Sequence, residues 1–470
     1  MDSILARASL LELVEALQRR QLSARELMEE TLRRIEALNP RLNAIVAMRD
    51  PEELMRDAAA ADERISRGEG RPLEGIPFGV KDLEDAAGLP TTYGSLVFRD
   101  NIADQDSIQV ARLKAAGAIL VGKTNTPEFG YTAITKNLVY GVTRSPWNEE
   151  RTPGGSSGGS AAAIAAGLLP LATSSDGGGS IRLPASFVGA FGLKPSYGRV
   201  PIGPNDAWQY VDTGCYGPLT RTVEDAAFFL DQVVGPSPYD PNSLPHPGYS
   251  YLARVRRRLD GPLRIAFSRD LGYTPVQRDI LALVEEAARV FDELGHEVEE
   301  VSGGPPPLGE AWTRLGNFVQ LSRLHRYLPE REGEFGRSFI AAVKAAREMT
   351  PELFGRLAEL REELNRWCAA LFTRYDLLLT PTVPFDPPPA KGPFPADIEG
   401  RPLPPVGVAA FTIPFNLSWH PAATVRVGFS EAGLPVGMQI VGPRHADDLV
   451  LQAARAFERE RPWHPHWPEL

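Results

Sequence analysis

Cysteine is scarce in this chain: Cys215 and Cys368 are the two that occur in 470 residues, and they form no C-x-x-C pair. A disulfide framework and a cysteine-rich metal site are therefore excluded, and a reducing cytoplasmic location is expected. Histidine is also rare, with seven in the chain. His464 and His466 are interpreted as tail residues rather than metal ligands, so no metal is expected.

Long apolar runs are missing as well. A helix that spans a bilayer needs about 20 consecutive apolar residues. The nearest candidate, residues 161–172, is shorter and contains Gly167 and Pro170. The N-terminal segment carries charges at Asp2 and Glu12 and does not follow the pattern of a signal peptide. We therefore expect neither insertion into a membrane nor export.

An excess of positive charge is also absent. The chain has 50 Lys and Arg against 60 Asp and Glu, which gives a net charge of −10 at pH 7. Negative charge opposes binding to phosphate backbones and to anionic membrane surfaces, so no nucleic-acid or membrane partner is expected. Apolar residues make up 43% and charged residues 23%, as in ordinary globular proteins that bury a core.

Helical patterns open the chain. Two capping boxes, Ser9 with Glu12 and Ser23 with Glu26, each precede apolar residues at helical spacing. The sequence therefore predicts two amphipathic helices, and Pro40 is expected to end the second one because proline removes a backbone donor.

Strand patterns alternate with further helical ones. In residues 75–82 (GIPFGVKD) apolar side chains occupy every second position, and Lys81 faces away from that apolar row. Other strands are predicted at residues 43–48, 118–121, 168–173, 263–267, 376–380 and 436–441. This alternation predicts an α/β fold in which helices cover one central sheet.

Proline is concentrated in two stretches. Five prolines lie within residues 236–247, and ten of the 25 residues at 381–405 are proline. The second stretch cannot form a central strand, because proline cannot donate to a sheet ladder. It is interpreted as a semi-rigid surface loop, and the functional alternative is a wall or lid over a pocket.

Two glycine and serine clusters lie close together, at residues 154–160 (GGSSGGS) and 176–182 (DGGGSIR). The first leads into an alanine-rich helical stretch, so close backbone approach within a packed unit explains its glycines better than a flexible linker does. In the second, consecutive glycines before Ser180 let several backbone N–H groups converge on one point, as an oxyanion site requires.

Residues 117–124 (GAILVGKT) match the letters of a phosphate-binding loop. A phosphate loop follows its strand and leads directly into a helix. Here the four intervening residues are themselves the predicted strand, and residues 125–127 separate the motif from any helix. A nucleotide site at Lys123 is therefore not predicted.

The first cluster also contains the pattern G-x-S-x-G, with Ser156 or Ser157 as the nucleophile of a hydrolase elbow. That elbow needs a preceding strand, whereas residues 148–153 are polar and end in proline. A histidine partner would have to come from His296, His325, His420 or His445, which are scattered. This interpretation is not favoured.

A serine nucleophile without a histidine needs another base, and a neutral lysine can serve. Lys81 is the natural candidate. Its ordinary pKa is about 10.4, and burial lowers the pKa of a lysine by up to several units.

Five segments together resemble the signature of a known family. They are GIPFGVKD around Lys81, GKTNTPEFG at 122–130, TPGGSSGGSAAAIAAG at 152–167, SSDGGGSIRLPASFVGAFGLKP at 174–195 and GLPVGMQIVG at 433–442. In these segments the chain is similar to the amidase signature family of serine hydrolases. The resemblance covers scaffold and chemistry but leaves out most of residues 235–400, and with them the choice of substrate.

The resemblance implies a catalytic set of Lys81, Ser156 and Ser180, with Ser156 following a cis peptide bond from Gly155. Ser180 would attack the carbonyl carbon, and Ser156 would relay its proton to Lys81 and return it to the leaving amine. Water would then hydrolyse the acyl-enzyme.

The family also implies surrounding groups. The oxyanion donors would be the backbone N–H groups of Gly177, Gly178, Gly179 and Ser180. The supporting positions would be Ser157, Asp176 and Arg182, of which Asp176 and Arg182 are expected to form a buried ion pair that braces the loop. Gly177 departs from the Thr or Ile that is common in relatives, which is expected to loosen the first donor.

The implied function is that of an amidohydrolase without metal or organic cofactor, acting on a small-molecule amide or carbamate. Neutral and aryl amides are expected, with esters and urethanes as further substrates. The negative net charge and aromatic residues near or between the motifs suit such substrates, although most of these rings are expected in the core. The aromatic residues are Phe129, Tyr131, Trp208, Tyr210, Phe318 and Trp419.

Two alternatives remain open: the glutaminase A subunit of a tRNA-dependent amidotransferase, and a non-catalytic binding module on the same scaffold. A homodimer is left open as well. The expected architecture is one α/β/α domain, residues 1–470, with a mixed central sheet. Its expected parts are the N-terminal helices at 1–60, the signature core at 70–230, a variable substrate-side region at 235–405, and a return to the sheet with a C-terminal helix at 406–470.

Overall fold

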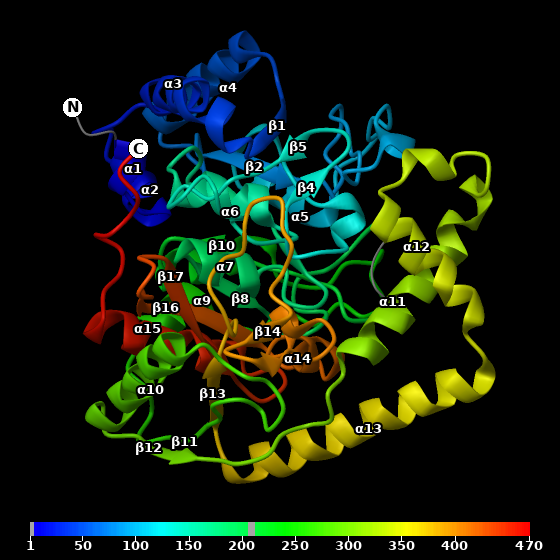
Figure 1. The fold of residues 1–470 in the computed structure, drawn as a ribbon. Coiled ribbons are helices and arrows are strands. Elements are labelled where there is room, and N and C mark those ends of the chain that lie inside the picture. The colour runs from blue at the N-terminus through cyan, green and yellow to red at the C-terminus, as the bar shows by residue number, and fades with distance from the viewer. Residues whose placement is uncertain (1–3, 205–211) are drawn as a thin grey trace.

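Two mixed β-sheets form the centre of the protein, as a computed structural model that describes residues 4–204 and 212–470 shows (Figure 1). One sheet has four strands and the other has seven. Their nearest strands, β6 (Leu171–Ala172) and β10 (Leu219–Thr220), lie beside each other. The predicted α/β fold is confirmed, with the expected central sheet divided into two hydrogen-bonded parts.

The four-stranded sheet has the order β1-β3-β2-β6. Its remaining strands are β1 (Ile45–Met48), β3 (Ile119–Thr124) and β2 (Pro77–Lys81). β2 runs parallel to both of its neighbours, and β1 is antiparallel to β3. All five residues of β2 are buried, so the period-two pattern correctly identified the strand but both of its faces are covered.

The seven-stranded sheet has the order β10-β8-β16-β17-β13-β11-β12. Its other strands are β8 (Phe191–Lys194), β16 (Ala422–Phe429), β17 (Pro435–Val441), β13 (Leu377–Pro381), β11 (Arg264–Phe267) and β12 (Glu297–Glu300). β11 is parallel to β12 and β13, and the other pairs are antiparallel. The predicted strands at 263–267, 376–380 and 436–441 are confirmed.

Helices pack on both sheets. The four-stranded sheet is packed by α3 (Ala24–Leu42), α4 (Pro51–Ser66) and α6 (Gly158–Ala165). The seven-stranded sheet is packed by α7 (Arg182–Val188), α8 (Val223–Val233), α10 (Arg278–Glu293) and α15 (Asp447–Glu460). α6 and α7 also pack on each other, so the two glycine-rich segments that precede them are brought together between the sheets.

The predicted N-terminal helices are present as α2 (Leu10–Gln18) and α3, and both capping boxes form. The prediction that Pro40 ends the second helix is wrong, because α3 includes it and continues to Leu42. Pro40 lies in the last turn, where its missing N–H removes one bond, and the Asn43 N–H closes that turn by donating to the carbonyl of Asn39 at 2.7 Å.

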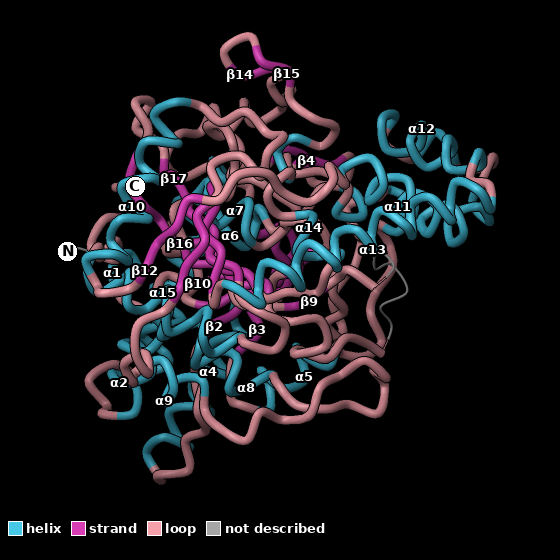
Figure 2. The backbone as a smooth tube through the Cα atoms, turned by 90° about the horizontal axis from the view of Figure 1, so that it is seen from below, coloured by secondary structure: helices cyan, strands magenta, loops and turns pink. Residues whose placement is uncertain are grey.

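Three helices of the variable region extend to one side of the sheets in both views (Figures 1 and 2). They are α11 (Gly309–Leu324), α12 (Arg337–Ala345) and α13 (Pro351–Arg374). Most of their buried apolar residues belong to two clusters separate from the main core, which Leu371 near the C-terminal end of α13 joins. The first turn of α11 contacts the loop before α7, where Trp312 Nε1 donates to the carbonyl oxygen of Gly177 at 2.8 Å.

The remaining elements are short. The helices are α1 (Ile4–Arg7), α5 (Ile108–Ala115), α9 (Tyr251–Val255), α14 (Ile413–Leu417), η1 (Leu96–Phe98), η2 (Glu128–Gly130), η3 (His325–Tyr327), η4 (Glu332–Glu334), η5 (Ala346–Glu348) and η6 (Gly407–Ala409). The strands are β4 (Lys136–Asn137), β5 (Gly141–Val142), β7 (Ser175–Asp176), β9 (Cys215–Tyr216), β14 (Asp397–Ile398) and β15 (Arg401–Pro402). Within the described parts of the chain, none of the helices is both long and apolar enough to cross a membrane.

Gly159 at the start of α6 shows why the first cluster needs glycine. A Cβ at this position would lie 2.2 Å from the backbone nitrogen of Asn125 and 2.7 Å from the carbonyl oxygen of Ala44. We expect Gly159→Ala to lower the free energy of unfolding by about 1–3 kcal/mol or more, because backbone atoms must shift. Urea unfolding followed by circular dichroism measures this.

Gly355, an exposed position near the N-terminal end of α13, is the matched control, since a Cβ there meets no atom within 4 Å. Gly355→Ala should raise stability by about 0.5–1 kcal/mol through helix propensity. Equal stability of the Gly159→Ala variant and the wild type would contradict the packing argument.

Candidate active site

Three segments meet between the two sheets and carry the predicted catalytic residues. Lys81 is the last residue of β2, Ser156 lies just before α6, and Ser180 lies between β7 and α7. The Ser157 N–H donates to the carbonyl oxygen of Ser180 at 3.2 Å, which ties the two serine-bearing loops together. The structure therefore brings Lys81 together with two serines that follow it by about 75 and 100 positions in the sequence.

The Lys81 amine is surrounded by hydroxyl groups. Its Nζ lies 2.7 Å from Ser156 Oγ, 2.8 Å from Ser157 Oγ and 3.0 Å from Ser175 Oγ. The residue is 1% exposed. Its backbone N–H donates to Thr173 Oγ1 at 3.0 Å, which fixes the end of β2. The amine is thus positioned to exchange a proton with Ser156.

Burial lowers the pKa of Lys81 to about 7, and the negative charges of Asp176 and Glu84 oppose this decrease. None of the hydroxyl groups around Nζ carries a charge that would hold the proton on it. A large fraction of the amine is therefore neutral near pH 7, as a general base requires.

Ser156 lies between the amine and a cavity. The peptide bond from Gly155 to Ser156 is cis, as the resemblance implied. On its other side, a Cβ at Gly130 would lie 3.1 Å from Ser156 Oγ. Gly130, Gly155 and Ser180 all line the same cavity. A larger residue at position 130 would therefore crowd the Ser156 hydroxyl.

A fully buried ion pair braces the loop that carries Ser180. Arg182 donates from Nε to Asp176 Oδ2 and from Nη2 to Asp176 Oδ1, both at 2.9 Å. Although burial opposes it, the Arg182 guanidinium holds the pKa of the Asp176 carboxyl well below its usual range. The interpretation of these two residues as a buried ion pair is confirmed.

Residues from the C-terminal third complete this network. Arg182 also donates to Asn416 Oδ1 at 2.6 Å and to Gln439 Oε1 at 2.7 Å. Asn416 Nδ2 donates to Asp176 Oδ1 at 2.9 Å. Gln439 lies in the GLPVGMQIVG motif, so the sequence indicated that this segment belongs to the family signature. No local pattern pointed to Asn416.

Residues 177–180 form the glycine loop, and one of its expected oxyanion donors makes a different hydrogen bond. The Gly179 N–H donates to Asp176 Oδ1 at 2.6 Å. This group, which the resemblance implied as an oxyanion donor, therefore binds the carboxylate of the Asp176–Arg182 ion pair instead. For the N–H groups of Gly177, Gly178 and Ser180, no acceptor occurs among residues 4–204 and 212–470. These three stay predicted as oxyanion donors.

The sequence did not single out Ser175, Thr173, Thr412 or Trp312. Ser175 contacts the lysine amine and lies inside the SSDGGGS motif, so its position in that motif could have marked it as a site residue. Thr412 Oγ1 donates to the Gly178 carbonyl at 2.7 Å, and Trp312 Nε1 donates to the Gly177 carbonyl at 2.8 Å. These last two lie outside the recognised motifs.

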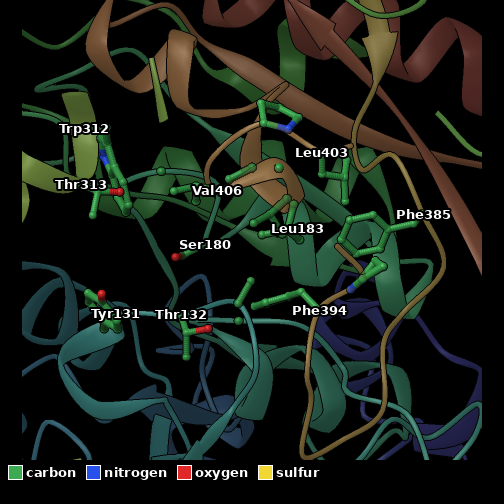
Figure 3. A pocket seen from close by; sticks show the side chains of 18 of the residues that line it. Tyr131, Thr132, Ser180, Leu183, Trp312, Thr313, Phe385, Phe394, Leu403 and Val406 are labelled. Atoms are coloured by element: carbon green, nitrogen blue, oxygen red, sulfur yellow. The ribbon is translucent and has the colours of Figure 1, made fainter. Parts of the chain in front are cut away.

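A cavity of about 390 Å³ opens in front of Ser180, within the range of ~300–1,000 Å³ that is usual for small-molecule sites. Figure 3 shows the Ser180 hydroxyl beside it, with Trp312 and Thr313 on one side and Leu403 and Phe385 on another. The largest apolar lining side chains are Leu183, Trp312, Phe385, Phe394, Leu403, Val406 and Val408. Residues 385–409 supply much of this wall, so the proline-rich stretch is the wall of a pocket and not a plain surface loop.

Most of the aromatic residues noted in the sequence lie elsewhere. Tyr131 lines the cavity. Phe129 packs in the cluster beneath α11 and α12, whereas Phe318 and Trp419 are partly exposed at the surface. Trp208 and Tyr210 fall outside the described residues. The other aromatic residues that line the cavity are Trp312, Phe385 and Phe394, which the motifs did not indicate.

Lys123, in the segment that matches a phosphate loop, is fully buried. Its amine donates to the Glu84 carbonyl and, at 3.0 Å, to Thr91 Oγ1. β3 contains Lys123 itself, so the residue cannot follow the strand as a phosphate-binding lysine does. The structure agrees with the rejection of a nucleotide site.

Comparison with known proteins gives a consistent result. The family model described as Amidase matches residues 26–451. An acylamidase of Rhodococcus erythropolis is 38% identical over 94% of this chain and 93% of its own length. The A subunit of the glutamyl-tRNA(Gln) amidotransferase of Roseiflexus sp. (strain RS-1) is 34% identical over 100% of this chain and 99% of its own. The crystal structure of a bacterial aryl acylamidase superposes with a TM-score of 0.90 at 33% identity, covering 97% of this chain and 96% of that one.

The Asp176–Arg182 brace should be essential for stability. Removing one partner of a buried ion pair leaves an uncompensated charge, so Arg182→Leu is expected to cost about 3–5 kcal/mol in the free energy of unfolding. Arg99→Leu is the control, because the Arg99–Asp100 pair is exposed and should change stability by less than about 0.5 kcal/mol. Denaturant titrations that give equal values for the two variants would contradict a structural role for the brace.

Proposed function

The chain belongs to the amidase signature family and is an amidohydrolase of non-peptide C–N bonds, and we propose that its substrates are neutral, apolar carboxylic amides, aryl amides among them. The reaction proceeds through Ser180 as nucleophile, Ser156 as proton relay and Lys81 as base. The observation that carries the substrate class is the cavity in front of Ser180, whose wall is apolar and aromatic.

The cavity wall carries no Asp, Glu, Lys or Arg among its lining residues in the described parts of the chain. An ionic substrate would lose its hydration there without gaining a partner, at a cost of several kcal/mol. An aryl or alkyl group gains about 25 cal/mol for each Å² of apolar surface that it buries. The wall therefore favours uncharged acyl and amine groups.

Polar lining residues are few and can orient an amide. They include Thr132, Thr313 and Asn317. A small number of polar groups in an apolar pocket fixes the orientation of a ligand while the apolar surface supplies affinity. The arrangement supports an amide held by its polar centre, with apolar groups on either side.

The mechanism begins with a neutral Lys81. Its lone pair accepts the proton of Ser156, whose oxygen in turn accepts the proton of Ser180 as Ser180 attacks the carbonyl carbon. The 2.7 Å distance between Lys81 Nζ and Ser156 Oγ supports the first transfer. The tetrahedral intermediate then collapses, and the proton returns through Ser156 to the leaving amine.

The oxyanion of the intermediate is held by the N–H groups of Gly177, Gly178 and Ser180. The loop is anchored by the Asp176–Arg182 ion pair, which keeps these donors oriented before the substrate arrives. Preoriented donors contribute about 2.7–4 kcal/mol each to the stability of the transition state. Water attacks the acyl-enzyme by the same proton route in reverse.

The glutaminase alternative is supported by similarity, along the whole chain, to the A subunit of an amidotransferase. Free glutamine carries an α-ammonium and an α-carboxylate, and each needs a partner of opposite charge when it is buried. The uncharged wall argues against that substrate.

Aryl esters and aryl carbamates fit the same apolar wall and remain within the proposal as secondary substrates.

A substrate screen of the isolated chain tests the substrate class. We expect acetanilide and longer acyl anilides to be hydrolysed with kcat/KM at least about a hundredfold above that for glutamine, because two unpaired buried charges cost several kcal/mol. Amine release measured by chromatography reports both. Ser180→Ala should reduce anilide turnover at least about 10⁴-fold, whereas Ser66→Ala, which removes an exposed hydroxyl on α4 that donates to the Glu63 carbonyl, should retain it.

Glutamine turnover that equals or exceeds anilide turnover would overturn the substrate class. Anilide turnover that survives in Ser180→Ala would overturn the assignment of the nucleophile.

The pH profile tests the role of Lys81, whose pKa burial lowers to about 7. Below that pH the amine is protonated and cannot accept a proton, so kcat/KM should fall roughly tenfold per pH unit below about pH 6 and level off above about pH 8. Initial rates with an anilide that does not titrate in this range provide the measurement. A flat kcat/KM between pH 6 and 9 would contradict a lysine base.

A further inference from the structure

Trp312 connects the variable region to the glycine loop. It lies in the first turn of α11, far from the signature motifs in sequence, and its indole lines the cavity beside Ser180 (Figure 3). Its Nε1 donates to the carbonyl oxygen of Gly177 at 2.8 Å. Its ring covers Gly178 so closely that a Cβ there would lie 2.6 Å from the ring atom Cζ2.

The next peptide of the loop is already fixed at both ends. The Gly178 carbonyl accepts a hydrogen bond from Thr412 Oγ1 at 2.7 Å, and the Gly179 N–H donates to Asp176 Oδ1 at 2.6 Å. The plane of that peptide is therefore set by two side chains. The peptide between Gly177 and Gly178 has one such partner in the described chain, which is Trp312 at its carbonyl end.

A trans peptide couples the directions of its two polar groups, because its C=O and N–H point in opposite directions in one plane. The bond between Gly177 and Gly178 is trans. Holding the Gly177 carbonyl toward the indole therefore also sets the direction of the Gly178 N–H. Glycine on both sides makes this peptide otherwise free to rotate.

We propose that Trp312 is a positioning residue for the reaction, and that its indole N–H holds the Gly177–Gly178 peptide so that the Gly178 N–H points at the carbonyl oxygen of the substrate. This proposal rests on the proposed function and adds a named residue from the substrate-side region to it. Trp312 acts through Gly178. Besides forming part of the wall, it couples occupation of the cavity to the alignment of an oxyanion donor.

The test removes the N–H while keeping the ring. Trp312→Phe and, as a closer isostere, replacement of Trp312 by β-(3-benzothienyl)alanine both preserve an aromatic surface over Gly178. Loss of a whole oxyanion donor costs about 10²–10³ in kcat, so misalignment of one should lower kcat about tenfold to a hundredfold. KM for an anilide should stay within about threefold of the wild-type value.

Two binding measurements separate alignment of the donor from packing. An aryl trifluoromethyl ketone, to which Ser180 adds and which thereby places an oxyanion in the site, should lose affinity by the same factor as kcat/KM. The Kd of the anilide itself, measured in the Ser180→Ala background, should not change when the indole N–H is removed. A residue that only formed the wall would change the Kd and leave kcat in place.

Trp147 provides the matched control. It is half-buried like Trp312, and its Nε1 donates to the carbonyl oxygen of Val188 at 2.8 Å, at the far end of α7 from Ser180. Trp147→Phe removes the same kind of hydrogen bond without touching the glycine loop. We expect it to leave kcat, KM and the affinity of the ketone within about twofold of the wild type.

Wild-type kcat in the folded Trp312 variants, or a change confined to KM and Kd, would overturn the proposal while leaving the proposed function intact. If Trp312→Phe does not fold, the benzothienyl variant decides by the same measurements. Full anilide turnover by Ser180→Ala would instead overturn the proposed function. The two failures are therefore distinguishable.

Discussion

The withdrawal of one amine from water is the constraint on which the rest of the site depends. Lys81 is fully buried at the end of a strand, and the nearest polar neighbours of its amine are the hydroxyl groups of three serines. The neutral hydroxyl groups bring no negative charge to balance the positive charge of the amine, so burial lowers the pKa of Lys81 to about 7. The nearby carboxylate of Asp176 would favour the charged amine, but its two oxygens are already bound by Arg182. The same ion pair thus braces the loop and moderates the electrostatic pull on the base.

Chemistry and substrate contact come from different parts of the chain. The proton route and the oxyanion loop lie within residues 81–182, whereas most of the apolar wall comes from residues 312–409. They meet because β13 and β17 pair in the seven-stranded sheet and α7 packs on that sheet directly after the glycine loop. A wall that is separate in sequence can change its side chains without altering the proton route. This is consistent with relatives that are named for different reactions, an acylamidase and an amidotransferase subunit.

Local patterns predicted much of the fold and the position of the lysine. The alternation in residues 75–82 correctly gave a strand with Lys81 at its end, and the capping boxes correctly gave α2 and α3. Strand β16 was not predicted, although its Thr and Val residues favour a strand. Pro40 was wrongly expected to end α3, because it lies in the last turn and the helix continues to Leu42. The use of the Gly179 N–H by Asp176 and the contact of Trp312 with Gly177 depend on how distant segments pack. No spacing within a motif encodes such contacts.

The proline-rich wall has a thermodynamic consequence for ligand capture. Proline restricts φ near −65° even in the unfolded chain, so a segment with ten prolines in 25 residues has few conformations to give up. A visiting molecule therefore meets a surface that is ordered in advance, and little of its binding energy is consumed in immobilising a loop. The pocket should therefore be largely preformed, and its selectivity should be set by a shape that exists before the ligand binds.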